Sequence, residues 1–250
     1  ESPLVSVNDL RVHFPVRRGI FSRVSGWVKA VDGVTFDVYR GQTLGLVGES
    51  GCGKTTTGRT IIGLEKATSG EINFEGKPVK DLSQDERRKF SQSVQMIFQD
   101  PYSSLNPRMS ISDTLAEPIR VHKLMERSEI DSRIVDLLQK VNLPPEFGKR
   151  YPHEFSGGQR QRISIARALA LNPRVIICDE AVSALDVTIK AQVINLLMDL
   201  QEELKLAFLF ISHDMAVVER ISHRVAVMYL GRIVEIGPRE AIFENPTHDY

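Results

Sequence analysis

The feature that most constrains this chain of 250 residues is a short run, Gly48–Thr55, that reads Gly-Glu-Ser-Gly-Cys-Gly-Lys-Thr. The run matches the phosphate-loop pattern G-x-x-x-x-G-K-[ST] at every fixed position. An apolar segment typical of a β-strand, Thr43–Val47, precedes it, and a helical pattern over Thr55–Leu64 follows it. Strand, glycine-rich loop and helix in this order are the context that the pattern requires, so we predict a site for a nucleoside triphosphate.

Each part of this loop has its own expected task. The glycines let successive backbone N–H groups turn toward phosphate oxygens, and the following helix adds its positive N-terminal end. Lys54 is expected to reach the β- and γ-phosphates, and the hydroxyl of Thr55 to hold Mg²⁺. The predicted ATP contacts in and after the loop are Gly48, Ser50, Gly51, Cys52, Gly53, Lys54, Thr55 and Thr56.

A second set of functional side chains follows an apolar run. Val175–Cys178 has the composition of a buried central strand, and Asp179 and Glu180 come directly after it. Ligands of parallel sheets bind beyond the carboxyl ends of the strands, which places both carboxylates beside the phosphate loop. Asp179 is suited to Mg²⁺, and Glu180 to activate an attacking water as a general base. The alternative for an isolated Asp-Glu pair is a solvated strand end.

Three further motifs complete an ordered series. Phe155–Gln159 reads Phe-Ser-Gly-Gly-Gln and opens a predicted helix, Gln99 ends a predicted strand, and His213 follows another apolar strand. Together with Ser183–Asp186, which reads Ser-Ala-Leu-Asp, these motifs resemble those of the ATP-binding cassette (ABC) ATPases. The resemblance extends over essentially the whole chain, from about residue 4 to residue 247.

The resemblance implies roles that the residues alone do not establish. A second, facing ATPase domain would form a head-to-tail pair with this one and sandwich two nucleotides. The signature residues of this chain would contact the ATP held by that partner: Ser156, Gly157, Gly158 and Gln159. Gln99 would ligate Mg²⁺ and, with His213, sense the γ-phosphate, whereas Ser183 and Asp186 would belong to the D-loop. A capped helix N-terminus is the alternative reading of Ser156.

We expect an α/β fold. Predicted helices and strands alternate from Gly157 onward, which implies a parallel sheet with helices on both faces. Two helices are predicted before that point, Ile111–His122 and Glu129–Val141, the second capped by Ser128. The resemblance implies the full architecture, a P-loop ABC ATPase domain with a RecA-like parallel-sheet core, an N-terminal antiparallel β part and a helical subdomain.

The expected domain limits follow from this architecture. Residues 1–99 and 156–250 would form the ATP-binding core with its β subdomain, and residues 100–155 the helical subdomain. The start at Glu1 and the resemblance of Asn245–Tyr250 to the entry of a C-terminal extension suggest one ABC domain cut from a longer chain.

The adenine ring is expected to stack on an aromatic side chain near the N-terminus. Phe14, after the predicted strand Val5–Val12, is the best match to that position. Trp27 is the rival, because the segment between Pro15 and Trp27 looks longer than in many cassettes. Either ring could instead belong to the core.

Three segments resemble the ATPases of bacterial peptide importers: Phe98–Pro107, Tyr151–Phe155 and Tyr229–Glu235. Two others resemble in particular the second cassette of fused glutathione or dipeptide importer ATPases: Ala181–Asp186 and Ser212–Gly237. This implies permease subunits in the membrane, an indirect link to a substrate-binding protein, and a peripheral location at the cytoplasmic face of the inner membrane. A permease helix would contact the loop Asp100–Ser110, where Tyr102, Leu105 and Met109 are either groove-lining or core residues.

Composition excludes some other classes. The 32 Lys and Arg residues balance the 32 Asp and Glu residues, which argues against a broadly basic nucleic-acid surface. A soluble ABC ATPase acting on nucleic acid or ribosomes is therefore the alternative function and not the first one. A non-hydrolysing scaffold is disfavoured because Glu180 and His213 are both present. No apolar run approaches the roughly 20 residues of a membrane-spanning helix, and the two cysteines form no disulfide or zinc pattern.

Overall fold

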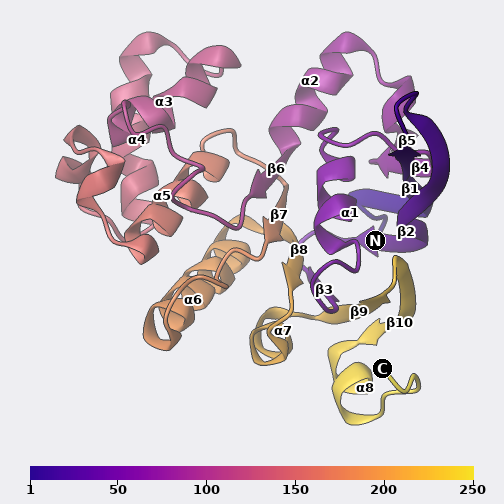
Figure 1. Ribbon diagram of the computed structural model, residues 1–250. Helices are drawn as coiled ribbons and strands as arrows, with labels where there is room; N and C mark the ends of the chain where they lie inside the picture. Colours follow the sequence, from indigo (N-terminus) through magenta and orange to yellow (C-terminus); the bar gives the residue numbers. More distant parts are fainter.

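Two β-sheets form the framework of the protein in this computed structural model, which describes all residues from 1 to 250 (Figure 1). The larger sheet has the strand order β10-β9-β3-β8-β7-β6, and the smaller one β2-β1-β4-β5. In chain order the strands are β1 Val5–Arg18, β2 Arg23–Val38, β3 Thr43–Val47, β4 Ser69–Phe74, β5 Lys77–Pro78, β6 Val94–Ile97, β7 Val175–Asp179, β8 Ala207–Ser212, β9 Arg224–Tyr229 and β10 Arg232–Pro238.

Eight α-helices and three short 3₁₀ helices connect these strands. The α-helices are α1 Lys54–Ile61, α2 Gln84–Ser93, α3 Ile111–Val121, α4 Arg127–Lys140, α5 Gly157–Leu169, α6 Val187–Leu204, α7 Met215–Ile221 and α8 Arg239–Glu244. The 3₁₀ helices are η1 Val79–Asp81, η2 Pro145–Lys149 and η3 Pro152–Glu154.

The central strands of the larger sheet are buried on both faces. Strands β9, β3, β8, β7 and β6 pair in parallel, and only β10 is antiparallel to its neighbour. In β8, Phe208 and Phe210 pack into one hydrophobic core, whereas Leu209 and Ile211 pack into the other. Such continuous apolar strands are typical of a sheet covered on both sides, and the predicted α/β fold is confirmed.

Different elements cover the two faces of this sheet. Helix α1 contacts β7 and β8 on one face, where the smaller antiparallel sheet completes the same core. Helix α7 contacts β3 and β8 on the opposite face, where α6 and α5 continue the layer. The predicted N-terminal antiparallel part therefore shares one face with α1. None of the helices combines the length and the apolar character that crossing a bilayer requires.

Helices α3, α4 and α5 pack together at one side of the sheet (Figure 1). Their contact is made by fully buried aliphatic side chains, among them Leu115, Leu137 and Leu138. The predicted cap of α4 is wrong, because the helix begins before Ser128. Its N-cap is Glu126, whose backbone N–H donates to the Glu129 carboxylate at 3.0 Å.

Strand β1 extends beyond the predicted segment Val5–Val12 and forms one long hairpin with β2, with its turn at residues 19–22. Helix α2 was not predicted from the sequence, because Phe90 is its only apolar and its only buried residue, so no repeat of apolar positions marks the helix. A capping box between Ser83 and Glu86 marks its start and was the available signal. Strand β10 and helix α8 were also not predicted.

Candidate nucleotide-binding site

The phosphate loop connects the fully buried strand β3 to helix α1. It is held from outside by two other parts of the chain. The N–H of Gly231 donates to the carbonyl of Cys52 at 3.0 Å, and the carbonyl of Ala30 lies where a side chain at residue 53 would have to stand. Gly53 also has a φ of +101°, in the left-handed region that favours glycine. The loop therefore needs glycine at residue 53 both for its backbone conformation and for its docking.

The N-terminal end of α1 presents unpaired donors to the loop. The first helical backbone bond runs from the N–H of Thr57 to the carbonyl of Gly53, so the N–H groups of Lys54, Thr55 and Thr56 precede it. Lys54 is buried, and its Nζ donates to the carbonyls of Gly48 and Glu49 at 2.5 and 3.0 Å. The free N–H groups at the start of α1, the positive end of the helix dipole and the Lys54 ammonium therefore lie together. This is the place where the sequence predicts phosphate binding.

A hydroxyl and a carboxylate meet beside this helix end. The Oγ1 of Thr55 donates to Oδ1 of Asp179, the last residue of β7, at 2.8 Å. Burial raises the pKa of the Asp179 carboxyl; the bond from Thr55 opposes that shift, and the nearby Glu180 adds to it. A buried carboxylate with a raised pKa favours a cation that restores its charged form. Asp179 and Thr55 therefore lie together as expected.

Glu180 and His213 form a second polar pair. Both oxygens of the Glu180 carboxylate lie 3.0 Å from Nδ1 of His213, which follows β8 directly. The Glu180 side chain is almost wholly buried, whereas that of His213 is about half exposed. Glu180 has a φ of +51° and donates its N–H to the carbonyl of Ile211, so its unusual backbone is held by the neighbouring strand.

Gln99 leaves the sheet at the same edge. Ile97, the last residue of β6, pairs with Cys178 of β7, so Gln99 and Asp179 follow neighbouring strand ends. Gln99 is exposed and makes no side-chain hydrogen bond. Its role as a metal ligand stays a prediction.

The two cysteines are both buried. Burial, followed by the charge of Asp179, raises the pKa of the Cys178 thiol, which therefore stays protonated. Cys52 lies inside the phosphate loop, with its Sγ 3.7 Å from Nζ of Lys54. Cys52 therefore packs beneath the lysine, and its expected contact with ATP stays a prediction.

The signature residues lie at the N-terminus of α5. Ser156 is the N-cap: its Oγ accepts the N–H of Gln159 at 3.3 Å, and the Gln159 side chain accepts the N–H of Ser156 at 3.1 Å. Gly158 lies against Ile189 of α6, so a larger residue there collides with α6. No hydrogen bond joins these residues to the phosphate loop, and α5 and α1 lie on different sides of the sheet (Figure 1).

The D-loop connects β7 to α6. Ser183 donates its Oγ to the carbonyl of Glu180 at 3.0 Å, and Asp186 caps α6 by accepting the N–H of Ile189 at 3.0 Å. A fully buried glutamine of α5, Gln161, donates to the carbonyl of Ala181 at 2.6 Å. This bond ties the signature helix to the segment that holds Glu180, and the sequence pattern did not single out Gln161 for that task.

The two candidate adenine partners both lie on the β1–β2 hairpin. Phe14 pairs with Val28 and is 39% exposed, while Trp27 pairs with Pro15 and is 58% exposed. Neither ring belongs to the core, so the core alternative is wrong for both. The hairpin continues to Ala30, which touches the phosphate loop, and both rings therefore stand on an element adjoining the site.

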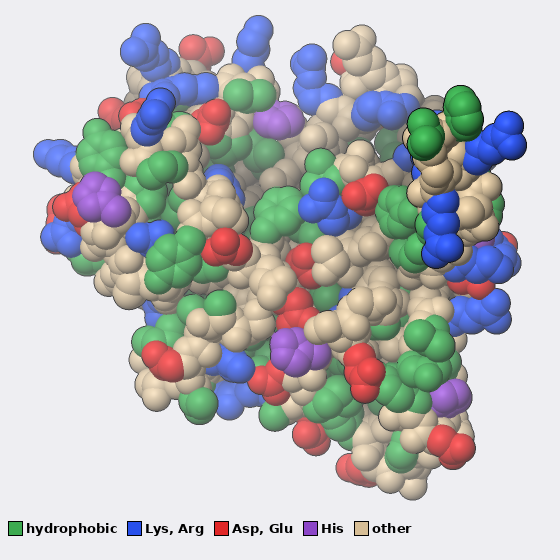
Figure 2. All heavy atoms as spheres, in the orientation of Figure 1, with side chains coloured by type: hydrophobic (Ala, Val, Ile, Leu, Met, Phe, Trp, Pro, Cys, Tyr) green, Lys and Arg blue, Asp and Glu red, His purple; other side chains and the backbone are tan.

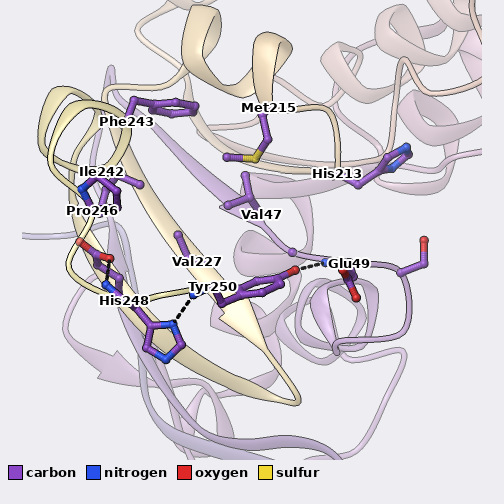
Figure 3. A pocket seen from close by; sticks show the side chains of 13 residues that line it. Val47, Glu49, His213, Met215, Val227, Ile242, Phe243, Pro246, His248 and Tyr250 are labelled. Atoms are coloured by element: carbon purple, nitrogen blue, oxygen red, sulfur yellow. Dashed lines mark hydrogen bonds between the residues drawn. The ribbon is translucent and has the colours of Figure 1, made fainter.

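A cleft of about 590 Å³ opens beside the phosphate loop, between that loop and the C-terminal segment after α8 (Figure 3). The hydroxyl of Tyr250 accepts the backbone N–H of Glu49 at 2.9 Å, and the Tyr250 ring packs on Tyr229 with centroids 4.7 Å apart. The Glu235 carboxylate accepts the N–H of Thr247 and of His248 at 3.1 Å, which holds the segment in place. No local sequence pattern indicates this contact, because Tyr250 and Glu49 are 201 residues apart.

The oxygen ligands at this edge of the sheet fit a Mg²⁺ ion that binds together with a nucleotide. No group of three or more His, Cys, Asp and Glu side chains converges in a way that could hold a metal by itself. Mg²⁺ is usually held in proteins by one or two carboxylates, with water and substrate phosphates completing the shell. The Thr55 hydroxyl and the Asp179 carboxylate, beside a phosphate loop, form such a set.

The fold and the polar groups at this edge of the sheet are together those of an ATP-binding cassette. Residues 31–183, more than half of the chain, match the sequence profile described as ABC transporter. The chain therefore belongs to the ABC transporter family, and the resemblance drawn from its motifs is confirmed.

Two curated relatives are similar in sequence to almost the whole chain. The glutathione import ATP-binding protein GsiA of Escherichia coli (strain K12) is 59% identical over 248 residues, and the protein of that name from Pectobacterium atrosepticum is 56% identical over 248 residues. Each match covers 99% of this chain and 40% of the relative. The chain thus spans less than half the length of these relatives.

Solved structures with the same fold are also cassettes. The cbiO1 protein of Clostridium perfringens, part of an ABC transporter complex, has a TM-score of 0.83 at 27% identity, covering 98% of this chain and 92% of that one. The cassette MJ0796, described as a dimer in a post-hydrolysis state with ADP and Pi, has a TM-score of 0.78 at 26% identity, covering 94% and 98%.

Proposed function

We propose that this chain binds and hydrolyses Mg²⁺-ATP as the cassette of a bacterial importer that takes up glutathione or similar short peptides. The observation that carries the proposal is the meeting of two polar pairs, Thr55 with Asp179 and Glu180 with His213, at one edge of the sheet. The substrate class is supported by the names of relatives more than half identical to the chain.

In the proposed reaction, residues of the loop bind the triphosphate. Lys54 exchanges its bonds to the carbonyls of Gly48 and Glu49 for bonds to phosphate oxygens, and the N–H groups at the start of α1 bind the same anion. Thr55 and Asp179 would hold Mg²⁺, which would supply Lewis-acid stabilisation of the phosphate charge. The adenine stacks on Phe14 or Trp27.

Glu180 is the proposed general base. Its carboxylate accepts a proton from the attacking water, and its burial keeps it in one orientation. Nδ1 of His213 holds that carboxylate and leaves the other ring nitrogen to face the γ-phosphate. Gln99 stands at the neighbouring strand end, where it would serve as a further ligand of Mg²⁺ and as a sensor of the γ-phosphate.

The proposed site is completed by a second ABC ATPase domain, either a copy of this chain or a relative. Ser156, Gly157 and Gly158 stand at the N-terminus of a helix remote from their own phosphate loop, and such an end binds anions. The similarity to MJ0796, a cassette described as dimeric, supports this pairing. Ser183 and Asp186 would lie at the interface between the two domains.

The proposed partners in the membrane are permease subunits, reached through the helical subdomain at residues 100–155. Tyr102 is exposed there, with Arg160 stacked 4.1 Å from its ring, and is available to a partner. Leu105 is buried in the core, so it is a core residue and does not line a groove for the permease helix. We place the cassette at the cytoplasmic face of the inner membrane, linked only indirectly to a substrate-binding protein. No observation favours the alternative role on nucleic acid or ribosomes.

The test is reconstitution of the chain with candidate permease subunits in lipid vesicles. We expect ATP-dependent uptake of glutathione into vesicles, abolished by Lys54→Ala and retained by Arg88→Gln, which removes an exposed cation of α2. Hydrolysis without uptake of glutathione or of any short peptide would overturn the substrate class. No hydrolysis in the full assembly would overturn the enzymatic proposal.

A further inference from the structure

The tip of the β1–β2 hairpin carries side chains that the nucleotide site does not use. The hairpin tip, residues 17–24, includes the two most exposed large hydrophobic residues of the chain, Ile20 at 98% and Phe21 at 85%. Val24 beside them is 49% exposed. In Figure 2, hydrophobic side chains at the upper right project from the hairpin beside blue Lys and Arg side chains. An apolar end of this kind marks a binding surface.

The outer part of this hairpin carries charge of one sign only. No Asp or Glu occurs from Leu10 to Val31, although Asp and Glu equal Lys and Arg in the chain as a whole. Arg17, Arg18 and Arg23 are exposed and take part in none of the ion pairs of the structure. The cations at the tip are therefore free to bind an external anion.

The strand register brings two of these cations together. Arg18 pairs directly with Arg23 across the ladder, and like charges at such opposed positions destabilise a hairpin. An anion bound between them relieves the repulsion. The turn that joins them is well defined, because the N–H of Ser22 donates to the carbonyl of Gly19 at 3.0 Å. The tip thus holds apolar and cationic groups in a fixed arrangement.

We propose that the hairpin tip docks on an anionic phospholipid surface. Ile20 and Phe21 enter the boundary between headgroups and acyl chains, while Arg17, Arg18 and Arg23 bind headgroup phosphates just above. An apolar end with cations immediately behind it matches the layering of a bilayer surface, which offers phosphate outside and hydrocarbon beneath. This contact goes beyond the proposed ATPase function and does not depend on it.

The test is co-sedimentation of the whole chain with lipid vesicles. We expect binding to vesicles of phosphatidylglycerol mixed with phosphatidylcholine, weakened by added salt, and at least about tenfold weaker binding to phosphatidylcholine alone. The triple variant Arg17→Gln, Arg18→Gln, Arg23→Gln is expected to lose this binding. The double variant Ile20→Ser, Phe21→Ser is expected to weaken it about tenfold at unchanged charge.

A matched control removes the same charge elsewhere. Arg87, Arg88 and Lys89 of α2 are consecutive, exposed and without ion pairs, so their triple change to Gln is expected to leave vesicle binding unchanged. If this control lost vesicle binding as strongly as the triple variant of the hairpin tip, net charge alone would explain the loss, and the proposal would be overturned. Failure of the parent chain to bind anionic vesicles would also overturn it. If the double variant instead dissociated a dimer in ultracentrifugation, the tip would be an interface between two copies.

Discussion

The N-termini of α1 and α5 share one property and differ in what surrounds them. Glycines precede α1 and open α5, and both helix ends offer unpaired N–H groups to an anion. The end of α1 has a buried cation, Lys54, and a carboxylate, Asp179, within reach. The end of α5 has only Ser156, already bound to its own helix. The two helix ends therefore differ in the charged groups beside them, and the proposed role of the α5 end is to complete a site in another domain.

The largest expected effect concerns the chemistry at the α1 end. Glu180→Gln keeps the size of the side chain and its bond with His213 and removes the base. We expect the turnover number for ATP to fall about a thousandfold with little change in ATP affinity, because a general base contributes about 10²–10⁴-fold. Steady-state hydrolysis and equilibrium binding measure the two quantities. Turnover within a few-fold of the parent would show that another group activates the water.

The second prediction tests the α5 end without removing its cap. Ser156→Asp retains an N-cap oxygen, since Asp caps as well as Ser, and places a negative charge where the partner's phosphate would bind. We expect hydrolysis to fall about a hundredfold and unfolding temperature to stay the same. The matched control is Ser83→Asp at the N-cap of α2, which has the same capping box. If both variants hydrolyse ATP normally, the α5 end has no role in the site.

The third prediction follows from the raised pKa of Asp179. Between its ordinary value of 3.8 and the raised value, the folded chain holds a proton that the unfolded chain lacks, so stability decreases as pH rises through this window. Asp179→Asn removes the buried charge. We expect its melting temperature without nucleotide at neutral pH to rise by about 2–4 °C, with a weaker dependence on pH.

When Mg²⁺-ATP is present, the substitution Asp179→Asn is expected to have the opposite effect on thermal stability. Mg²⁺ with ATP is expected to raise the melting temperature of the parent and to leave that of Asp179→Asn nearly unchanged, because the metal has lost its carboxylate. Thermal scans across pH, with and without Mg²⁺-ATP, measure both effects. A variant less stable than the parent at every pH would contradict the assignment of an uncompensated buried charge.

The smallest expected effect concerns the C-terminal contact with the phosphate loop. Tyr250→Phe removes the hydroxyl that accepts the N–H of Glu49 and keeps the ring on Tyr229. We expect about a twofold to threefold rise in KM for ATP with unchanged turnover, the effect of one exposed hydrogen bond on a positioned loop. Tyr39→Phe, which removes an accessory hydroxyl far from the loop, is the control. A fall in turnover alone would assign Tyr250 a different role.

Short-range sequence patterns were sufficient to predict several parts of the fold and of the candidate site. The loop at residues 48–55 and the apolar run ending in Asp179 each contain their own signal, since strand, turn and helix preferences act over a few neighbouring residues. The long hairpin was not predicted to its full length, because its exposed tip lacks the alternation of apolar and polar residues that indicates a strand. Helix α2 was not predicted for the same reason, as only Phe90 of its residues is buried.

By itself, the sequence determined the kind of chemistry, because phosphate, metal and base groups each require particular side chains in a short fixed order. Only the tertiary structure decided which of those groups meet. Strands β3, β7 and β8 are distant in sequence but adjacent in the sheet, so Thr55 contacts Asp179 and Glu180 contacts His213. The same packing keeps Ser156 away from its own phosphate loop and brings Tyr250 to it. Contacts between distant segments depend on how whole surfaces pack, which no local pattern encodes.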